Sequence, residues 1–216
     1  MPYRWAACRL LLRDGTEPNE AMIDRRIQML GGAGLTAGEC ERLRHIRHRA
    51  ARLESVGARV ALLWALLGNG GVHDWEDVPD LTRLLDRPLC SFGCDALGAP
   101  RPIGEHAVSL AHCHGRAIAV MSKEGRIGVD IESVSRAVPH PGAMADRFFS
   151  PAEQLLWREN GEGAGSFLRI WTRKEALGKA QGLGLDRIGE LDTVAAKACF
   201  EEISMDGYIV SVCQLK

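Results

Sequence analysis

The sequence predicts an α+β protein made of two similar subdomains, each a small antiparallel sheet packed with one long helix. Two observations lead to this prediction. A long helical pattern occurs twice, and both copies begin with the same capping signal. Strand-like segments lie between the two helical regions and again after the second. We place the subdomain boundary between residues 1–105 and 106–216, and we expect the two halves to be related by a pseudo-twofold duplication.

The two predicted helical regions cover residues 35–68 and 150–182, and the second is interrupted by the glycine-rich segment 160–165. Each region opens with a capping box, in which Ser or Thr is followed three residues later by Glu: Thr36 with Glu39, and Ser150 with Glu153.

Strand-like segments fill 106–113, 116–122 and 126–133, and the residues between them are good turn formers. We expect these three segments to form an antiparallel meander. A further hairpin is expected over 197–215, with its turn at Asp206 and Gly207.

Composition excludes several classes of function. The formal net charge is −1, so no global field attracts nucleic acid or a membrane surface. The apolar N-terminal run is broken by Arg9 and Arg13, which disfavours a membrane span or a signal peptide. Seven cysteines without CxxC spacing indicate reduced thiols, as expected of a cytoplasmic protein.

The predicted strand "RIGVDIESV" carries two carboxylates, Asp130 and Glu132, on the same face as Gly128. Like charges side by side on a strand cost stability. A solvated outer face would explain them, and so would a bound cation.

The helical segment "FLRIWTRKEALGKAQG" carries three further charged candidates. Lys174 lies near the middle of its apolar arc, so this lysine either snorkels to solvent or pairs with an anion held close to the core. Glu175 and Lys179 face one way, which is usual for a surface pair at i, i+4. If Glu175 joins Asp130 and Glu132, the three carboxylates form a hard oxygen site suited to Mg²⁺.

Together these motifs resemble the 4′-phosphopantetheinyl transferase superfamily, in its longer, two-subdomain surfactin-synthetase-activating (Sfp) type. The family shows a G-hydrophobic-D-hydrophobic-E strand, matched here by residues 128–132. It also shows W-x-x-K-E-[AS]-x-x-K on a helix, matched here by residues 171–179.

The resemblance implies a holo-[acyl-carrier-protein] synthase type of enzyme. Coenzyme A would give its 4′-phosphopantetheine arm to a serine of an apo acyl or peptidyl carrier protein, releasing adenosine 3′,5′-bisphosphate. Asp130, Glu132 and Glu175 would hold Mg²⁺ against the pyrophosphate, and Lys179 would neutralise the phosphate or protonate the leaving group. The base would be Glu175, Glu153 or a water between them, although Glu153 is also the glutamate of a capping box.

The family also implies residues that bind the nucleotide end of coenzyme A. In this sequence the matching residues are Arg52, Arg59, His112 and Lys174. For the two arginines the alternative is a solvated helix face, and for His112 it is a half-buried structural residue. Four positions depart from the family pattern and predict weaker nucleotide binding: Leu63, Ala99, Ala111 and Cys113.

We expect coenzyme A to lie between the subdomains of a monomer, with no nucleic-acid or membrane partner. A carrier from fatty acid, polyketide or nonribosomal peptide biosynthesis would dock near 136–149, where Arg147, Met144, Phe148 and Phe149 offer charge and apolar contacts. The alternative function is a non-catalytic module that binds coenzyme A or a carrier and keeps only the fold.

Overall fold

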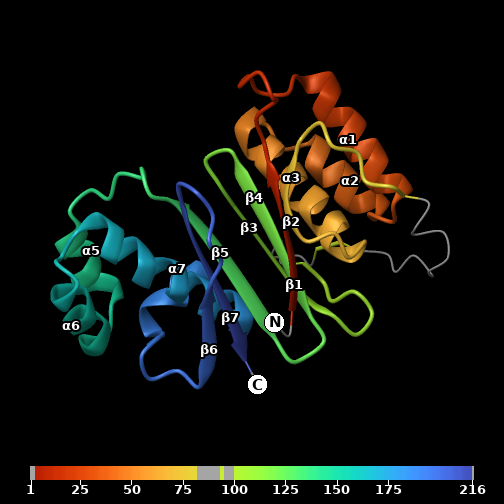
Figure 1. Ribbon diagram of the computed structural model, residues 1–216. Coiled ribbons are helices and arrows are strands. Elements are labelled where there is room, and N and C mark those ends of the chain that lie inside the picture. The colour runs from red at the N-terminus through yellow and green to blue at the C-terminus, as the bar shows by residue number, and fades with distance from the viewer. Residues whose placement is uncertain (1–2, 82–92, 95–99, 216) are drawn as a thin grey trace. The chain divides into compact units, whose positions relative to one another are not determined.

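The computed structural model describes residues 3–81, 93–94 and 100–215. The chain divides into two compact units, residues 1–124 and 125–216 (Figure 1). The sequence placed the division after residue 105. The difference arises because the strands 107–113 and 116–122 pair with the first strand of the chain and so complete the sheet of the first unit.

The first unit contains a four-stranded sheet in the order β2-β1-β4-β3, in which β2 is parallel to β1 and the other pairs are antiparallel. The strands are β1 (Tyr3–Arg9), β2 (Gly71–Asp74), β3 (Ala107–Cys113) and β4 (Arg116–Ser122). The helices in the described part of this unit are α1 (Glu20–Gly32), α2 (Ala37–Arg44) and α3 (Arg49–Leu66).

The long helix α3 packs against β1, β4 and β3, as Figure 1 shows. Close packing is possible at Gly57, where an added Cβ would lie 2.2 Å from a methyl carbon of Leu10. The helical region predicted over 35–68 is interrupted at 45–48, so that α2 and α3 are separate helices. Thr36 caps α2 by accepting a hydrogen bond from the backbone N–H of Glu39.

The second unit contains a three-stranded antiparallel sheet in the order β5-β7-β6. Its strands are β5 (Ile127–Ser133), β6 (Ala198–Glu202) and β7 (Tyr208–Leu215). Its helices are α5 (Pro141–Phe148), α6 (Pro151–Glu159), α7 (Ala164–Gln181) and the short 3₁₀ helix η1 (Leu185–Glu190).

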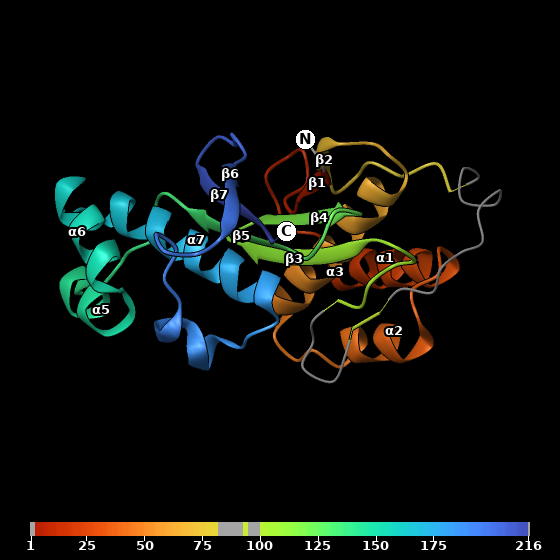
Figure 2. The same cartoon turned by 90° about the horizontal axis from the view of Figure 1, so that it is seen from below.

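The helix α7 packs against β5 and β7 (Figure 2). A buried hydrogen bond of 2.8 Å between the hydroxyls of Thr172 and Ser211 ties the helix to the central strand of the sheet. Each unit therefore has an 18-residue helix on a small, mainly antiparallel sheet, and the predicted α+β class is confirmed.

The predicted meander is wrong in its third strand. β3 and β4 pair as expected, but β5 pairs with β7, with Asp130 opposite Ser211. The chain bends at 123–125, but this bend closes no hairpin, because β4 pairs with β1 and β5 pairs with β7. The hairpin predicted over 197–215 is confirmed as β6 and β7.

Among the described residues, no helix is both long enough and apolar enough to cross a membrane.

Candidate metal and phosphate site

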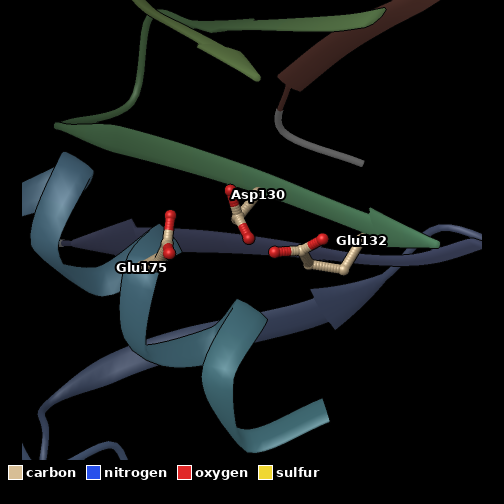
Figure 3. A group of neighbouring side chains, drawn as sticks. All are labelled: Asp130, Glu132 and Glu175. Atoms are coloured by element: carbon tan, nitrogen blue, oxygen red, sulfur yellow. The ribbon is translucent and has the colours of Figure 1, made fainter. Parts of the chain in front are cut away.

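Three carboxylates from two elements converge in the second unit. Asp130 and Glu132 extend from β5 and Glu175 from α7, and one oxygen of each lies within 4.8 Å of the others (Figure 3). Asp130 and Glu132 are buried, and Glu175 is half-buried. The structure thus brings together the three residues that the sequence predicted as metal ligands.

The convergence follows from the alternation of β5 and from one glycine. The same face of β5 presents residues 128, 130 and 132 toward α7. At Gly128 an added Cβ would lie 2.0 Å from the carbonyl oxygen of Ala176 and 2.6 Å from the backbone nitrogen of Ala180. The missing side chain therefore lets the helix backbone approach the strand and brings the neighbouring Glu175 to the two carboxylates.

Two cations adjoin the cluster. The Lys179 ammonium donates to Asp130 Oδ1 at 2.8 Å and to the carbonyl oxygen of Val129 at 3.0 Å. The Arg136 guanidinium forms an ion pair with Glu132. Lys179 is therefore turned toward β5, and it does not form the surface helix pair with Glu175 that its spacing also allowed.

Glu175 is the least compensated of the three carboxylates. Burial, and then the negative charge of Asp130, raise its pKa to about 7, although the Lys179 charge opposes this shift. Near neutral pH this group can therefore either accept a proton or, when ionised, bind a cation.

The donor set fits a divalent cation of the Mg²⁺ type. All three ligands are carboxylate oxygens, which suit Mg²⁺. Asp130 Oδ2 is buried and has no hydrogen-bond donor among the described residues, and a buried carboxylate oxygen without a donor is costly. A cation between the carboxylates would satisfy this oxygen and offset the repulsion of the cluster.

Lys174 and Glu153 lie in the core, away from solvent. Both side chains are fully buried, and the Lys174 ammonium lies 2.5 Å from Glu153 Oε2 and also donates to the carbonyl oxygen of Leu191. The lysine therefore pairs with an anion in the core, which is one of the two alternatives read from its position on the helix. Its predicted contact with the nucleotide is not supported, because it exposes no surface to a ligand.

Glu153 uses both of its carboxylate oxygens within the protein. One accepts from the backbone N–H of Ser150, completing the predicted capping box, and from Lys174. The other accepts from the backbone N–H and the hydroxyl of Thr193, both at 2.8 Å. The capping alternative is confirmed, and these contacts weigh against a role for Glu153 as the base.

Arg59 was expected either to bind the nucleotide or to lie on a solvated helix face, and the structure shows neither. It is 6% exposed and donates to Glu39 Oε1 through Nε at 3.0 Å and through Nη2 at 2.7 Å. Although burial opposes ionisation, hydrogen bonding from Arg42 and the charge of Arg59 lower the pKa of Glu39 to about 2. The guanidinium is neither on a solvated helix face nor presented to a phosphate, because its partner is already in the core.

The remaining nucleotide candidates lie closer to solvent. His112 is exposed on β3, and its Nδ1 lies 3.1 Å from a carboxylate oxygen of Glu54. Arg52 forms an ion pair with Glu20 and donates to the carbonyl oxygen of Arg44 at 3.4 Å. Of the two, His112 presents the larger surface to a ligand.

Three departures from the family pattern are core positions in this chain. Leu63 has no exposed surface, so a charged residue there would have to enter the core. Ala111 and Cys113 are buried on the face of β3 opposite to His112, so hydroxyls at these positions would not point with the histidine. The fourth departure, Ala99, lies outside the described residues.

The apolar residues proposed for carrier docking belong largely to the fold. Phe149 is buried and stacks on Phe167 with 4.8 Å between ring centroids. Phe148 meets Trp171 edge to face at 5.5 Å. Both rings therefore hold α5 and α7 together, and of the proposed contacts only the cation of Arg147 remains clearly exposed.

Arg136 is the site residue that the sequence analysis missed. The available signal was its position four residues after Glu132, but that spacing reports a contact on a helix and has no such meaning after a strand. The contact depends on a turn at 133–136 that places the guanidinium beside Glu132.

The fold and the acidic site agree with one class of protein. Residues 126–205 match the family model of the 4′-phosphopantetheinyl transferase superfamily. The match contains all three carboxylates and Lys179, and it confirms the resemblance seen in the sequence.

Several curated proteins are similar to this chain. A putative 4′-phosphopantetheinyl transferase, slr0495 of Synechocystis sp., is 38% identical over 79 residues, covering 36% of this chain and 32% of that protein. The 4′-phosphopantetheinyl transferase HetI of Nostoc sp. is 33% identical over 86 residues, covering 39% and 36% respectively. The 4′-phosphopantetheinyl transferase AcpT of Salmonella typhimurium is 30% identical over 108 residues, covering 49% and 56%. The matched region thus spans from about a third to just over half of each relative.

Proposed function

We propose that this protein transfers the 4′-phosphopantetheine arm of coenzyme A to a serine of an apo acyl or peptidyl carrier protein. The observation that carries the proposal is the cluster of three carboxylates with Lys179 beside it, inside the region that matches the superfamily. Mg²⁺ is part of the proposal, because the donor set fits it.

In this proposal Asp130, Glu132 and Glu175 would hold Mg²⁺, which would bind the pyrophosphate of coenzyme A. The bound cation would stabilise negative charge on the phosphate oxygens. The burial of Asp130 and Glu132 supports this role, since electrostatic interactions are stronger where water is excluded.

The reaction forms a bond between the serine oxygen and the β-phosphorus and breaks the bond from that phosphorus to the bridging oxygen. Glu175, directly or through a water, accepts the proton of the serine hydroxyl. The Lys179 ammonium neutralises or protonates the departing bisphosphate, for which it must exchange one of its present acceptors.

For the nucleotide end, we retain His112 and Arg52 and assign no direct contact to Arg59 or Lys174, because both of the latter are paired in the core. Three expectations from the sequence remain parts of the proposal. They are a carrier from fatty acid, polyketide or nonribosomal peptide biosynthesis, a cytoplasmic location and a monomeric state.

The test is mass spectrometry of several apo carrier proteins incubated with this protein, coenzyme A and Mg²⁺. We expect one phosphopantetheine to be added to at least one carrier. The addition should be lost with EDTA and in Asp130→Asn, and it should persist in Glu159→Gln, which removes an exposed carboxylate of α6. Metal-dependent binding of coenzyme A without any transfer would instead support the non-catalytic binding module.

A further inference from the structure

Arg136 is held beside the acidic cluster by a tight turn that follows β5. Its backbone N–H donates to the carbonyl oxygen of Ser133 at 3.0 Å, and the N–H of Ser135 donates to the Ser133 hydroxyl at 3.2 Å. The next residue after the strand, Val134, is fixed by a hydrogen bond of 3.0 Å from its N–H to the carbonyl oxygen of Gly207. The turn thus has a defined backbone, and it returns the side chain of Arg136 to the strand that it has just left.

The two partners of this ion pair differ in their exposure. The Glu132 side chain is 9% exposed, whereas the Arg136 side chain is 37% exposed. The guanidinium therefore covers the outer side of a buried carboxylate and still faces solvent. In that position it can meet a ligand that approaches the cluster from outside.

The contact places Arg136 in competition with a metal. Its guanidinium bonds to Glu132, one of the three carboxylates whose oxygens lie within 4.8 Å of one another. A cation held by that cluster draws on the same carboxylate and weakens its bond to the arginine. A guanidinium released at the rim of such a site is well suited to phosphate, which it can bind through two parallel hydrogen bonds.

We propose that Arg136 exchanges partners, neutralising Glu132 in the metal-free protein and binding a phosphate oxygen of coenzyme A once a metal occupies the cluster. This inference rests on the proposed function and adds to it a residue that couples the metal to the anionic substrate. Because the metal frees the arginine and the arginine then binds the phosphate, each ligand strengthens the binding of the other.

The proposal predicts effects of opposite sign on the two ligands. We would measure Mn²⁺ affinity from the paramagnetic resonance of free Mn²⁺, and coenzyme A affinity by calorimetry at saturating Mn²⁺. In Arg136→Gln, Mn²⁺ alone should bind up to about fivefold tighter, since a competing surface ion pair is gone. Coenzyme A should bind about tenfold weaker, since a charge-assisted hydrogen bond is lost.

Two further variants control the measurement. Arg136→Lys keeps the charge but loses the paired donors, so it should leave Mn²⁺ affinity near the native value and give an intermediate loss for coenzyme A. Arg158→Gln removes an exposed arginine of α6 that pairs with Glu162, and it should change neither affinity.

Several results would overturn the proposal. If Arg136→Gln weakens Mn²⁺ binding, the arginine orients Glu132 and does not compete with the metal. If coenzyme A affinity is unchanged, the arginine does not bind the phosphate. If the native protein binds no Mn²⁺, or Asp130→Asn binds it equally well, the proposed metal site fails together with this inference. The first two results would leave the proposed function intact.

Discussion

The backbone of α7 passes so close to β5 that a methyl group on Gly128 would lie 2.0 Å from the carbonyl oxygen of Ala176. The obstacle is backbone, so no side-chain rotation can relieve the contact. This approach is what brings Glu175, the residue before Ala176, to the carboxylates of the strand. The glycine that opens the strand motif therefore acts through packing, and the acidic residues that follow it supply the chemistry.

Gly128→Ala should lower the free energy of unfolding by about 1–3 kcal/mol, because the helix must move away from the strand. It should also weaken Mg²⁺ binding, because Glu175 moves with the helix. Urea unfolding and calorimetric Mg²⁺ titration would measure the two effects. Gly165→Ala is the matched control, since an added Cβ there meets nothing within 4 Å, and it should be neutral or stabilising by about 0.5–1 kcal/mol. Native Mg²⁺ affinity in Gly128→Ala would contradict this account.

Removing one partner of the buried pair Lys174 and Glu153 should lower the free energy of unfolding strongly. Replacing both partners should lower it by less than the sum of the two single losses. Glu153→Gln and Lys174→Met should each destabilise the protein by about 3 kcal/mol, because each leaves an uncompensated group in the core. The double variant should lose clearly less than the sum, as a double-mutant cycle of urea unfolding would show.

The same double variant also tests the base. If the carrier is still modified at a substantial rate when both residues are replaced, Glu153 is not the proton acceptor. Loss of transfer in a stably folded double variant that still binds coenzyme A and Mg²⁺ would return Glu153 to that role.

Stability should depend on pH through Glu175. Its folded-state pKa of about 7 lies above the usual value of 4.5, so between these values the folded state holds a proton that the unfolded state has released. Stability from this group should therefore fall as pH rises from about 4.5 to 7, by roughly 1.4 kcal/mol for each pH unit fully within that window.

Urea midpoints of the native protein and Glu175→Gln, compared between pH 5 and 8 without metal, would measure this slope. The variant should lack the fall, because its side chain stays neutral. Saturating Mg²⁺ should reduce the fall in the native protein, because a bound cation favours the ionised carboxylate. An identical slope in both proteins would show that Glu175 does not titrate in this range.

Variants of His112 and Arg59 should differ in whether they affect coenzyme A binding or the free energy of unfolding. His112→Ala removes an exposed side chain and should weaken coenzyme A binding with little change in unfolding free energy. Arg59→Met should destabilise the first unit by about 1.5–3 kcal/mol, because Glu39 loses its buried partner and keeps only the ion pair with the more exposed Arg42. Adding Glu39→Gln should recover part of that loss. Weaker coenzyme A binding in a stable Arg59→Met, Glu39→Gln double variant would show that the arginine has a ligand role after all.

The sequence predicted the fold class from local patterns, and it predicted the acidic cluster through the resemblance of its motifs to the superfamily. Alternation along 127–133 assigns Asp130 and Glu132 to one face, and helical spacing assigns Glu175 and Lys179 to one side. The ends of the long helices were less readable. The capping residues Thr36 and Ser150 begin the shorter helices α2 and α6, whereas α3 and α7 begin after His48 and Gly163 without a side-chain cap.

What the sequence did not reveal depends on pairing between distant segments. The residues around Lys174 do not reveal that its ammonium will bind Glu153 and the carbonyl oxygen of Leu191. The residues around Arg59 likewise do not reveal its ion pair with Glu39. The pairing of β5 with β7 likewise depends on residues far along the chain. Such pairings decide whether a charged side chain meets a ligand or the core.

The order of strands in the second unit has a consequence for synthesis on the ribosome. β7 lies between β5 and β6 although it follows both in sequence, so neither of them has a partner in the ladder until residues 208–215 have emerged. The sheet of the first unit is complete once residue 122 is free, so its formation does not have to await the second unit. The carboxylates of β5 are thus synthesised well before β7, the strand that pairs with β5 and joins it to β6 in one sheet.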